Sequence, residues 1–304
     1  MLPKQSVLYK KIVSFVTKTL YVSIIICTSI VARESDEEVH QLRVGNFAVP
    51  GSMQPGPLLG FGQNIIDQFD TLAVVYPIMI FGERQHFIDI APEVLYGVRD
   101  DLSLILAFPT AVSFKYDGHH SSGSLDTIVQ LEYAPYSQHK PTETNQISFV
   151  GSMIFPTGNE CKQPATGFGS LSFFLGAVGV HLATEWYGYT SFGVLFPTKS
   201  DNVKPGNHII YQAGVGKNIA YRAEKWTLMW MLELSGIYNQ KTKVNGIKDP
   251  NSGSNTVIMG PALWFSTDRF LLEAGIAPVI SEHVFGDQFK TRVNASIYTG
   301  WRFN

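Results

Sequence analysis

The chain has 304 residues, of which only 16% are charged, well below the roughly 25% that is typical of soluble globular proteins. Hydrophobic residues make up 45%, which is too few for a bundle of membrane helices and too many for a disordered chain. The 27 glycines and 16 prolines argue against long helices. This composition excludes a helical transporter and a coiled coil, and it leaves an all-β fold to be tested along the chain.

Residues 1–32 have the features of an export signal. The first 18 residues carry four lysines and no acidic residue, and Leu20–Val31 is an apolar stretch that ends at the small residue Ala32. A helix needs about 20 apolar residues to cross a bilayer, so we predict a cleaved signal peptide rather than an anchor. Its loss leaves 19 basic against 25 acidic residues, a net charge of −6, and a single cysteine, Cys161. We therefore expect no nucleic-acid partner and no intrachain disulfide.

The rest of the chain alternates with a period of two, and its charges fall on the less apolar face. In residues 226–239, for example, Leu228, Trp230 and Leu232 share one face, whereas Met231 and Glu233 share the other. A soluble barrel would instead place its charged side chains on the exposed face. The pattern predicts strands whose apolar face meets lipid, as in transmembrane β-barrels of the bacterial outer membrane.

Twelve strands are predicted, at residues 71–82, 86–98, 102–115, 125–135, 146–156, 169–182, 186–197, 208–219, 226–239, 255–266, 270–281 and 290–303. The connections alternate between short ones, of which 137–145 is the longest, and longer ones, such as 116–124, that are rich in Gly, Asn, Lys and Ser. Short periplasmic turns and longer external loops are typical of outer-membrane barrels. The fold class expected is therefore all-β, a transmembrane antiparallel up-and-down barrel of about 12 strands over residues 71–304. The faces of residues 71–82 and 169–182 are apolar on both sides, so their orientation stays open.

Residues 33–70 do not fit a strand pattern, because an acidic patch is followed by a stretch rich in proline and glycine. Two interpretations remain open for this irregular segment. It is either a loose periplasmic leader or a plug that folds into the lumen of the barrel. The plug would use its apolar side chains, which are Phe47, Val49, Leu58, Leu59 and Phe61.

The inward faces of the predicted strands supply the candidate lumen residues. The charged ones are Asp89, Glu93, Lys115, Asp126, Glu132, Glu233, Glu273, Arg292 and Arg302. The apolar and aromatic ones are Ile128, Ile154, Tyr187, Tyr189, Met229, Met231 and Trp264. The charged set either forms salt bridges that pack a narrow barrel or makes a constriction that orients a solute. The mixture with Met, Tyr and aliphatic side chains suits a small hydrophobic or amphipathic compound better than ions or sugars.

Catalysis and metal binding have weak support in the sequence. Ser121 or Ser122 with His119 or His120 resembles the nucleophile and base of an outer-membrane lipid hydrolase, but nothing in this Gly/Ser-rich stretch holds them in place. The same histidines with Asp117 match no established metal site. We therefore expect no enzyme activity, no cofactor and no metal.

Short motifs in residues 152–197 carry a family resemblance. A strand ends in Phe155-Pro156-Thr157-Gly158, Gly167-Phe168-Gly169 opens the next one, and Tyr187–Gly193 follows a short turn. This pattern resembles the outer-membrane barrel family labelled "putative MetA-pathway of phenol degradation", over about residues 65–304. The resemblance implies a transporter-type barrel, distantly similar to channels for fatty acids and aromatic hydrocarbons, and it brings no catalytic residues.

The C-terminus departs from the usual pattern of outer-membrane barrels, in which the last residue is aromatic. Here Phe303 is followed by Asn304, and we expect the barrel-assembly machinery to recognise Trp301 and Phe303. The function expected is passive passage of small hydrophobic or amphipathic molecules through a monomeric barrel surrounded by outer-membrane lipid. The alternative is a structural or surface-interaction barrel with a closed lumen that acts through its external loops.

Overall fold

The structure, a computed structural model, describes residues 45–303, so the predicted export segment and the acidic patch lie outside the described residues. Two short 3-10 turns, η1 (Gly45–Phe47) and η2 (Gly51–Met53), precede the strands. The strands are β1 (Thr71–Gly82), β2 (Gln85–Arg99), β3 (Leu102–Ala107), β4 (Thr110–Tyr116), β5 (His119–Ser124), β6 (Thr127–Lys140), β7 (Glu143–Phe155), β8 (Ser172–Ala183), β9 (Trp186–Pro197), β10 (Val203–Lys204), β11 (His208–Arg222), β12 (Trp226–Asn239), β13 (Lys243–Val244), β14 (Ile247–Lys248), β15 (Ser254–Thr267), β16 (Phe270–Val284) and β17 (Thr291–Phe303). None of the helical turns within residues 45–303 is long and apolar enough to cross a membrane.

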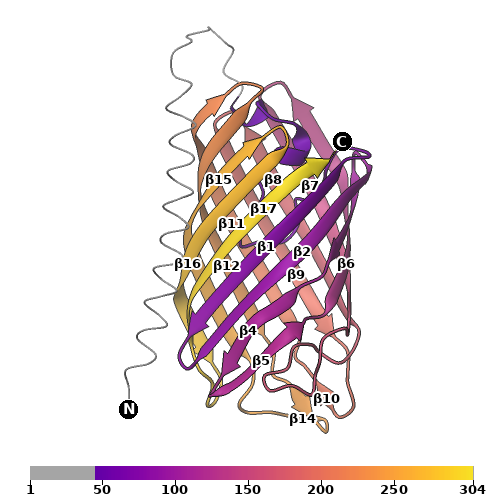
Figure 1. Ribbon diagram of the computed structural model, residues 1–304, viewed down its shortest axis with the longest axis vertical. Helices are drawn as coiled ribbons and strands as arrows, with labels where there is room; N and C mark the ends of the chain where they lie inside the picture. Colours follow the sequence, from indigo (N-terminus) through magenta and orange to yellow (C-terminus); the bar gives the residue numbers. More distant parts are fainter. Residues whose placement is uncertain (1–44, 304) are drawn as a thin grey trace. The chain divides into compact units, whose positions relative to one another are not determined.

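The long strands form one antiparallel sheet that closes into a barrel (Figure 1). Each strand is hydrogen-bonded to the next in the order β1-β17-β16-β15-β12-β11-β9-β8-β7-β6-β3-β2, and β1 also pairs with β2. At the closure, Val75 lies opposite Thr299 of β17 on one side and opposite Pro92 of β2 on the other. Closure pairs the backbone groups that an open sheet edge would leave bare, which is what a strand surrounded by lipid requires.

Twelve strands span the barrel, because two of them are interrupted. β3 and β4 both pair with β2 and are separated only by Phe108 and Pro109, while Leu125 and Asp126 separate β5 from β6. The predicted all-β, twelve-stranded antiparallel barrel is therefore confirmed. The loop predicted at 116–124 is wrong, since residues 119–124 form β5. Asp117 and Gly118 both have positive φ angles, 47° and 88°, and together make a tight hairpin turn that lets the strand continue.

The two ends of the barrel differ. At one end the strands are joined by two- or three-residue turns, and both ends of the described chain lie there (Figure 1). The predicted connection 137–145 belongs to this end but is only two residues long, because β6 runs to Lys140 and β7 begins at Glu143. The opposite end carries the longer loops, which contain β10, β13 and β14 (Figure 1). By the usual rule for this class, the short-turn end is periplasmic and the long-loop end external.

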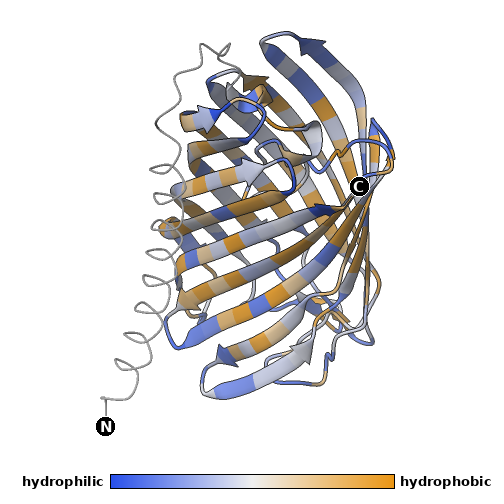
Figure 2. Cartoon of the chain, turned by 45° about the horizontal axis from the view of Figure 1, so that its top comes forward, coloured by the Kyte–Doolittle hydropathy of each residue, from blue (hydrophilic) through white to orange (hydrophobic). Residues whose placement is uncertain are grey.

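Hydrophobic and hydrophilic residues alternate along many of the strands (Figure 2), and the burial of individual side chains shows which of them face the lumen and which the outer surface. Met229 and Met231 of β12 are fully buried, whereas Trp230 between them is 42% exposed. The same contrast orients β8, in which Val178 is buried and Leu175 is 62% exposed. In β1, Leu72 and Val74 are buried. In β1 and β8, the even-numbered residues near the short-turn end of the barrel therefore face inward. The outer surface is left with a broad set of exposed aliphatic and aromatic side chains, which is the surface that lipid requires.

Candidate functional site: the hatch segment and the lumen

Residues 45–70, here called the hatch segment, enter the barrel at the short-turn end and return to the same end. Near its start, the Asn46 backbone N–H donates to Thr184 O at 3.0 Å, in the turn between β8 and β9. Near its end, the Gln68 backbone N–H donates to the Asp100 carboxylate at 2.9 Å, in the turn between β2 and β3. The chain between these points reaches into the lumen as an irregular loop. It therefore enters and leaves the barrel at the periplasmic end.

Two buried carboxylates of the wall hold the middle of the hatch segment. Glu233 of β12 accepts hydrogen bonds from the backbone N–H groups of Leu58 at 3.2 Å and Leu59 at 2.9 Å. Glu132 of β6 accepts from the backbone N–H groups of Gln63 at 2.5 Å and Asn64 at 3.0 Å. Bonds to an ionised acceptor are about twice as strong as neutral ones, so these four contacts fix the tip of the segment against two opposed parts of the wall.

The carboxylates are themselves positioned by hydroxyl groups. Glu132 also accepts from Ser148 Oγ of β7 at 2.8 Å, and Glu233 from the Tyr189 hydroxyl of β9 at 2.8 Å. Between them, Gln212 of β11 accepts from the Phe61 backbone N–H at 3.2 Å and donates through Nε2 to Leu59 O at 2.7 Å. Most polar groups of the buried tip thus bond to the wall, as a backbone without secondary structure requires when it is removed from water.

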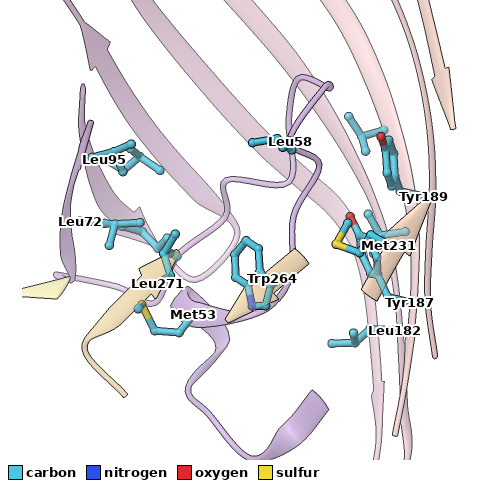
Figure 3. Packing of buried hydrophobic residues seen from close by; sticks show 14 of the residues in the cluster. Met53, Leu58, Leu72, Leu95, Leu182, Tyr187, Tyr189, Met231, Trp264 and Leu271 are labelled. Atoms are coloured by element: carbon cyan, nitrogen blue, oxygen red, sulfur yellow. The ribbon is translucent and has the colours of Figure 1, made fainter. Parts of the chain in front are cut away.

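Apolar contacts complete the seat of the hatch segment (Figure 3). Leu58 and Met53 are almost fully buried and belong to one cluster with Trp264 and Leu271 of the wall. Phe61 packs edge to face on Phe174 of β8, with the ring centroids 4.7 Å apart. The burial of Leu58, Met53 and Phe61 stabilises the closed arrangement by about 1.5–3 kcal/mol for each side chain, before the entropic cost of ordering the segment is subtracted.

A cavity of about 720 Å³ lies between the hatch segment and the wall. Its wall side is mostly aliphatic and aromatic, and its polar lining includes the carboxyl groups of Glu93 and Glu273. A second cavity of about 330 Å³ lies at the long-loop end, among β1, β12, β15, β16, β17 and the loop 285–290. Tyr116 and Phe289 line this second cavity, with ring centroids 5.3 Å apart.

The structure places most of the predicted charged residues inside the barrel, but not with the partners expected. Glu132 and Glu233 hold backbone N–H groups of the hatch segment rather than cations. Asp126 is also buried and binds backbone, accepting from Gly158 N at 2.9 Å and Phe168 N at 2.8 Å in the long loop 156–171. Asp89 is buried in the wall, and Glu93 and Glu273 line the larger cavity.

Two of the three basic residues lie elsewhere than predicted. β4 has one extra residue between Ala111 and Phe114, opposite Ile88 and Asp89 of β2, and this bulge reverses the faces of the rest of β4, because one extra residue flips every later side chain. Lys115 therefore pairs with His86 on the outer face, and its assignment to the lumen is wrong. Arg292 is 64% exposed at the external rim and paired with Glu83, so it lines neither cavity.

Arg302 faces inward but serves the root of the hatch segment. Its guanidinium lies 2.6 Å from Asp70 and 3.6 Å from Asp67, at the short-turn end of β17. The ion pair with Asp70 fastens the point where the hatch segment becomes β1.

The apolar residues predicted for the lumen and the plug all lie in or beside the interior cluster. Tyr187, Tyr189, Met229, Met231 and Trp264 are buried in it, and the Tyr187 hydroxyl bonds to the Gln63 side chain. Ile128 lines the larger cavity and pairs with Ile154 across β6 and β7. Of the hatch residues, Val49 and Leu58 are buried, Phe47 and Phe61 pack against the cluster, and Leu59 is half-buried.

The sequence missed several polar residues that hold the hatch segment. They are Asn46 of the segment, which donates to Ala183 O of the wall, and Ser103, Gln212 and Ser266 of the wall, which bond to the segment. Ser103 Oγ accepts from Ile66 N at 3.0 Å, and Ser266 Oγ donates to Met53 O at 2.9 Å. Ser103, Gln212 and Ser266 were visible only as polar residues on inward faces, and nothing in the sequence distinguishes them from residues that meet lumen water.

The serine and histidine residues weighed for catalysis do not form a nucleophile and base pair. The Ser121 hydroxyl donates to Pro164 O at 2.7 Å, and His120 Nε2 lies 3.2 Å from Ser113 Oγ. Within residues 45–303, no group of three or more His, Cys, Asp or Glu is placed to hold a metal ion.

Asp67, near the point where the hatch segment becomes β1, is a titratable group with a shifted pKa. Burial, together with the neighbouring Asp70 carboxylate, raises the pKa of Asp67 above its usual value of 3.8, against the lowering effect of Arg302. A carboxyl whose folded-state pKa is raised stabilises the fold fully only below its unfolded pKa, and this contribution is lost as the pH rises through the folded pKa. Ionised Asp67 therefore loosens the root at neutral pH.

Replacing Asp67 with asparagine should tighten the hatch segment at pH 7 and leave it unchanged at pH 3.5. Hydrogen-exchange protection factors of residues 63–69, corrected for the intrinsic rate at each pH, measure this directly. The matched variant Asp70→Asn loses the 2.6 Å ion pair with Arg302 and should lower protection instead. Equal protection for Asp67→Asn and the unmodified chain at pH 7 would contradict the inference that ionised Asp67 loosens this end of the hatch segment.

Known structures share this fold. The crystal structure of the COG4313 outer membrane channel from Pseudomonas putida F1 superposes with a TM-score of 0.65 at 14% sequence identity, covering 82% of this chain and 99% of that one. The NanC porin matches with a TM-score of 0.47 at 11% identity, over 76% of this chain and 99% of the porin. No curated protein matches the sequence. The closed barrel and its apolar outer surface together make this a transmembrane β-barrel with the fold of bacterial outer-membrane proteins.

A family model matches residues 57–282, which comprise most of the barrel and the tip of the hatch segment. The family is described as "Putative MetA-pathway of phenol degradation". The expected resemblance is thus confirmed, and the chain belongs to this family.

Proposed function

We propose that the barrel gives small hydrophobic or amphipathic molecules passive passage across the outer membrane. The observation that carries this proposal is the 720 Å³ cavity beside the hatch segment, whose wall combines Leu72, Ile105 and Leu182 with Gln130 and Glu93. Predominantly apolar walls with a few placed polar groups are typical of sites for small organic ligands. A water-filled pore for sugars or ions would have a more uniformly polar wall.

The hatch segment is the proposed gate of this channel. It occupies the lumen between its two ends, and its tip is held by hydrogen bonds and side-chain packing. Because both limbs start from the periplasmic end, the tip can move aside without threading through the barrel. Apolar contacts and bonds at defined points also give the segment a defined closed state.

A closed structural barrel is the second candidate, favoured by the burial of Leu58, Met53 and Gly62 in the lumen. In that case the hatch segment would be a permanent filling, and the external loops would carry the function. The buried carboxylates argue for a movable segment, since a permanent filling could use apolar contacts alone.

Two further proposals concern partners, and the first is that an assembly factor binds Trp301 and Phe303. They are 47% and 52% exposed at the periplasmic end of β17, where an assembly factor can reach them. The closed ring of strands needs no second copy to cover an edge, which supports a monomer within outer-membrane lipid.

Liposome swelling with zwitterionic amino acids and the uncharged sugar glucose tests the function, because these solutes cross lipid very slowly unaided. Proteoliposomes should swell faster in leucine or phenylalanine than in serine or glucose, after correction for solute size. A rate that depends on size alone would indicate an unselective pore. An absence of swelling in every solute, with heat-modifiable migration showing a folded barrel, would favour the closed structural barrel.

A further inference from the structure

The two cavities share an unusual charge balance. The residues that line the larger one include Asp67, Glu93, Asp100 and Glu273, and those that line the smaller one include Glu282. Neither lining contains a lysine or an arginine. Residues 45–303 contain 17 basic and 21 acidic residues, so the complete absence of basic residues is a property of the two linings and favours cations there.

The smaller cavity combines a carboxylate with aromatic rings. Tyr116 and Phe289 lie on one side, and Ile80, Ile237 and Ile258 provide aliphatic walls. Its volume of about 330 Å³ is at the lower end of the range for small-molecule sites. Aromatic faces attract organic cations, and a ring beside a carboxylate is a common way to bind an ammonium group.

Two residues that line the smaller cavity each have a side-chain oxygen that accepts no hydrogen bond from the described residues. Glu282 Oε1 accepts from Thr291 N at 3.1 Å and Thr256 Oγ1 at 3.2 Å, but Oε2 is buried without a partner among the described residues. Asn239 donates through Nδ2 to Ser254 Oγ at 3.0 Å, while its Oδ1 is likewise buried and unpartnered. Two unsatisfied acceptors on residues that line one cavity call for a ligand that donates hydrogen bonds.

Two arginines near this end are already paired. Arg84 lies 2.6 Å from Asp117 and stacks on Phe289 at 5.0 Å, and Arg292 is paired with Glu83. The arginine on Phe289 shows that this ring accepts a cation on one face. Glu282 has no basic partner among the ion pairs of residues 45–303, so its charge is free to meet a ligand.

We propose that the lumen recognises organic ammonium ions with an apolar or aromatic body, and that Glu282, Asn239, Tyr116 and Phe289 form their first binding site at the external end. This inference deepens the proposed passage function and rests on it only for the onward step. Binding at the external cavity stands independently, because it requires no movement of the hatch segment.

Isothermal titration of the folded full chain in a zwitterionic detergent tests the site with four probes of similar size. They are 2-phenylethylammonium, phenyltrimethylammonium, 2-phenylethanol and 3-phenylpropionate. The primary ammonium should bind most tightly, because it supplies both charge and hydrogen-bond donors, with the quaternary ammonium next. The neutral alcohol should bind at least tenfold more weakly than the primary ammonium, and the anion should not bind.

Glu282→Gln keeps the Oε1 acceptor for Thr291 and Thr256 but removes the charge, so binding of 2-phenylethylammonium should fall by about tenfold or more. Asp287→Asn, in the loop 285–290 that follows the strand of Glu282 but outside the cavity lining, is the matched control and should change binding by less than twofold. Equal binding of the anion, or unchanged binding in Glu282→Gln, would overturn the inference. Heat-modifiable migration confirms that each variant is folded.

The same variants separate this inference from the proposed function. Ammonium-selective binding without any solute passage would leave the site standing and contradict the channel. Solute passage without any preference for ammonium binding would leave the channel standing and contradict the site.

Discussion

Replacing both Glu132 and Glu233 with glutamine should convert a mostly closed barrel into one that conducts for much of the time. Each glutamine keeps the size of the side chain but presents an NH₂ group where the carboxylate accepted a second backbone N–H. Losing a hydrogen bond to a charged group costs about 1.5–3 kcal/mol, and every 1.4 kcal/mol is a factor of ten in the closed-to-open ratio. We therefore expect the open probability to rise at least tenfold for each replacement.

Single-channel recording in planar bilayers measures this rise. Asp126→Asn is the matched control, because Asp126 binds two backbone N–H groups in the same way but in the loop 156–171. The control should disturb that loop and leave the closed state of the hatch segment intact. If Asp126→Asn and the double variant raised the open probability equally, the two glutamates would have no special role in closing the lumen.

Most of the barrel could be predicted from the sequence because membrane strands obey two simple rules. Apolar side chains must alternate with less apolar ones, and connections must alternate between short and long. The first rule is visible in β12, where Trp230 faces outward and Met229 and Met231 on either side of it face inward. The rules fail where a strand gains an extra residue. Lys115 was assigned to the wrong face because the irregularity between Ala111 and Phe114 leaves no mark in the local composition.

The interior chemistry was less accessible, because its partners are distant in sequence and belong to the backbone. Glu233 and Leu58 are 175 residues apart, and the donor at Leu58 is a main-chain N–H that every residue except proline possesses. The inward position of Glu233 was therefore predictable, whereas its role was not. Charged side chains in a lumen suggest ion pairs with other side chains, and here the irregular hatch segment supplies the donors instead.

Locking the tip of the hatch segment to the wall should abolish passage. An ideal Cβ on Gly62 would lie 3.5 Å from the Cβ of Val178 in β8, within the range of disulfide bonds. Gly62→Cys with Val178→Cys, in a chain whose native Cys27 and Cys161 are replaced by serine, should therefore form a cross-link on oxidation. The φ angle of +81° at Gly62 is unfavourable for cysteine, so the single variant Gly62→Cys serves as the control for any loosening of the tip.

The central claim is that the hatch segment must move for a solute to pass, and the locked variant tests it most directly. Swelling of proteoliposomes in phenylalanine is measured on one preparation, first oxidised and then after addition of a reductant. We predict swelling at the background rate when oxidised and recovery to the rate of the reduced single variant after reduction. Equal swelling in both states, with the cross-link verified by mass spectrometry, would contradict the account.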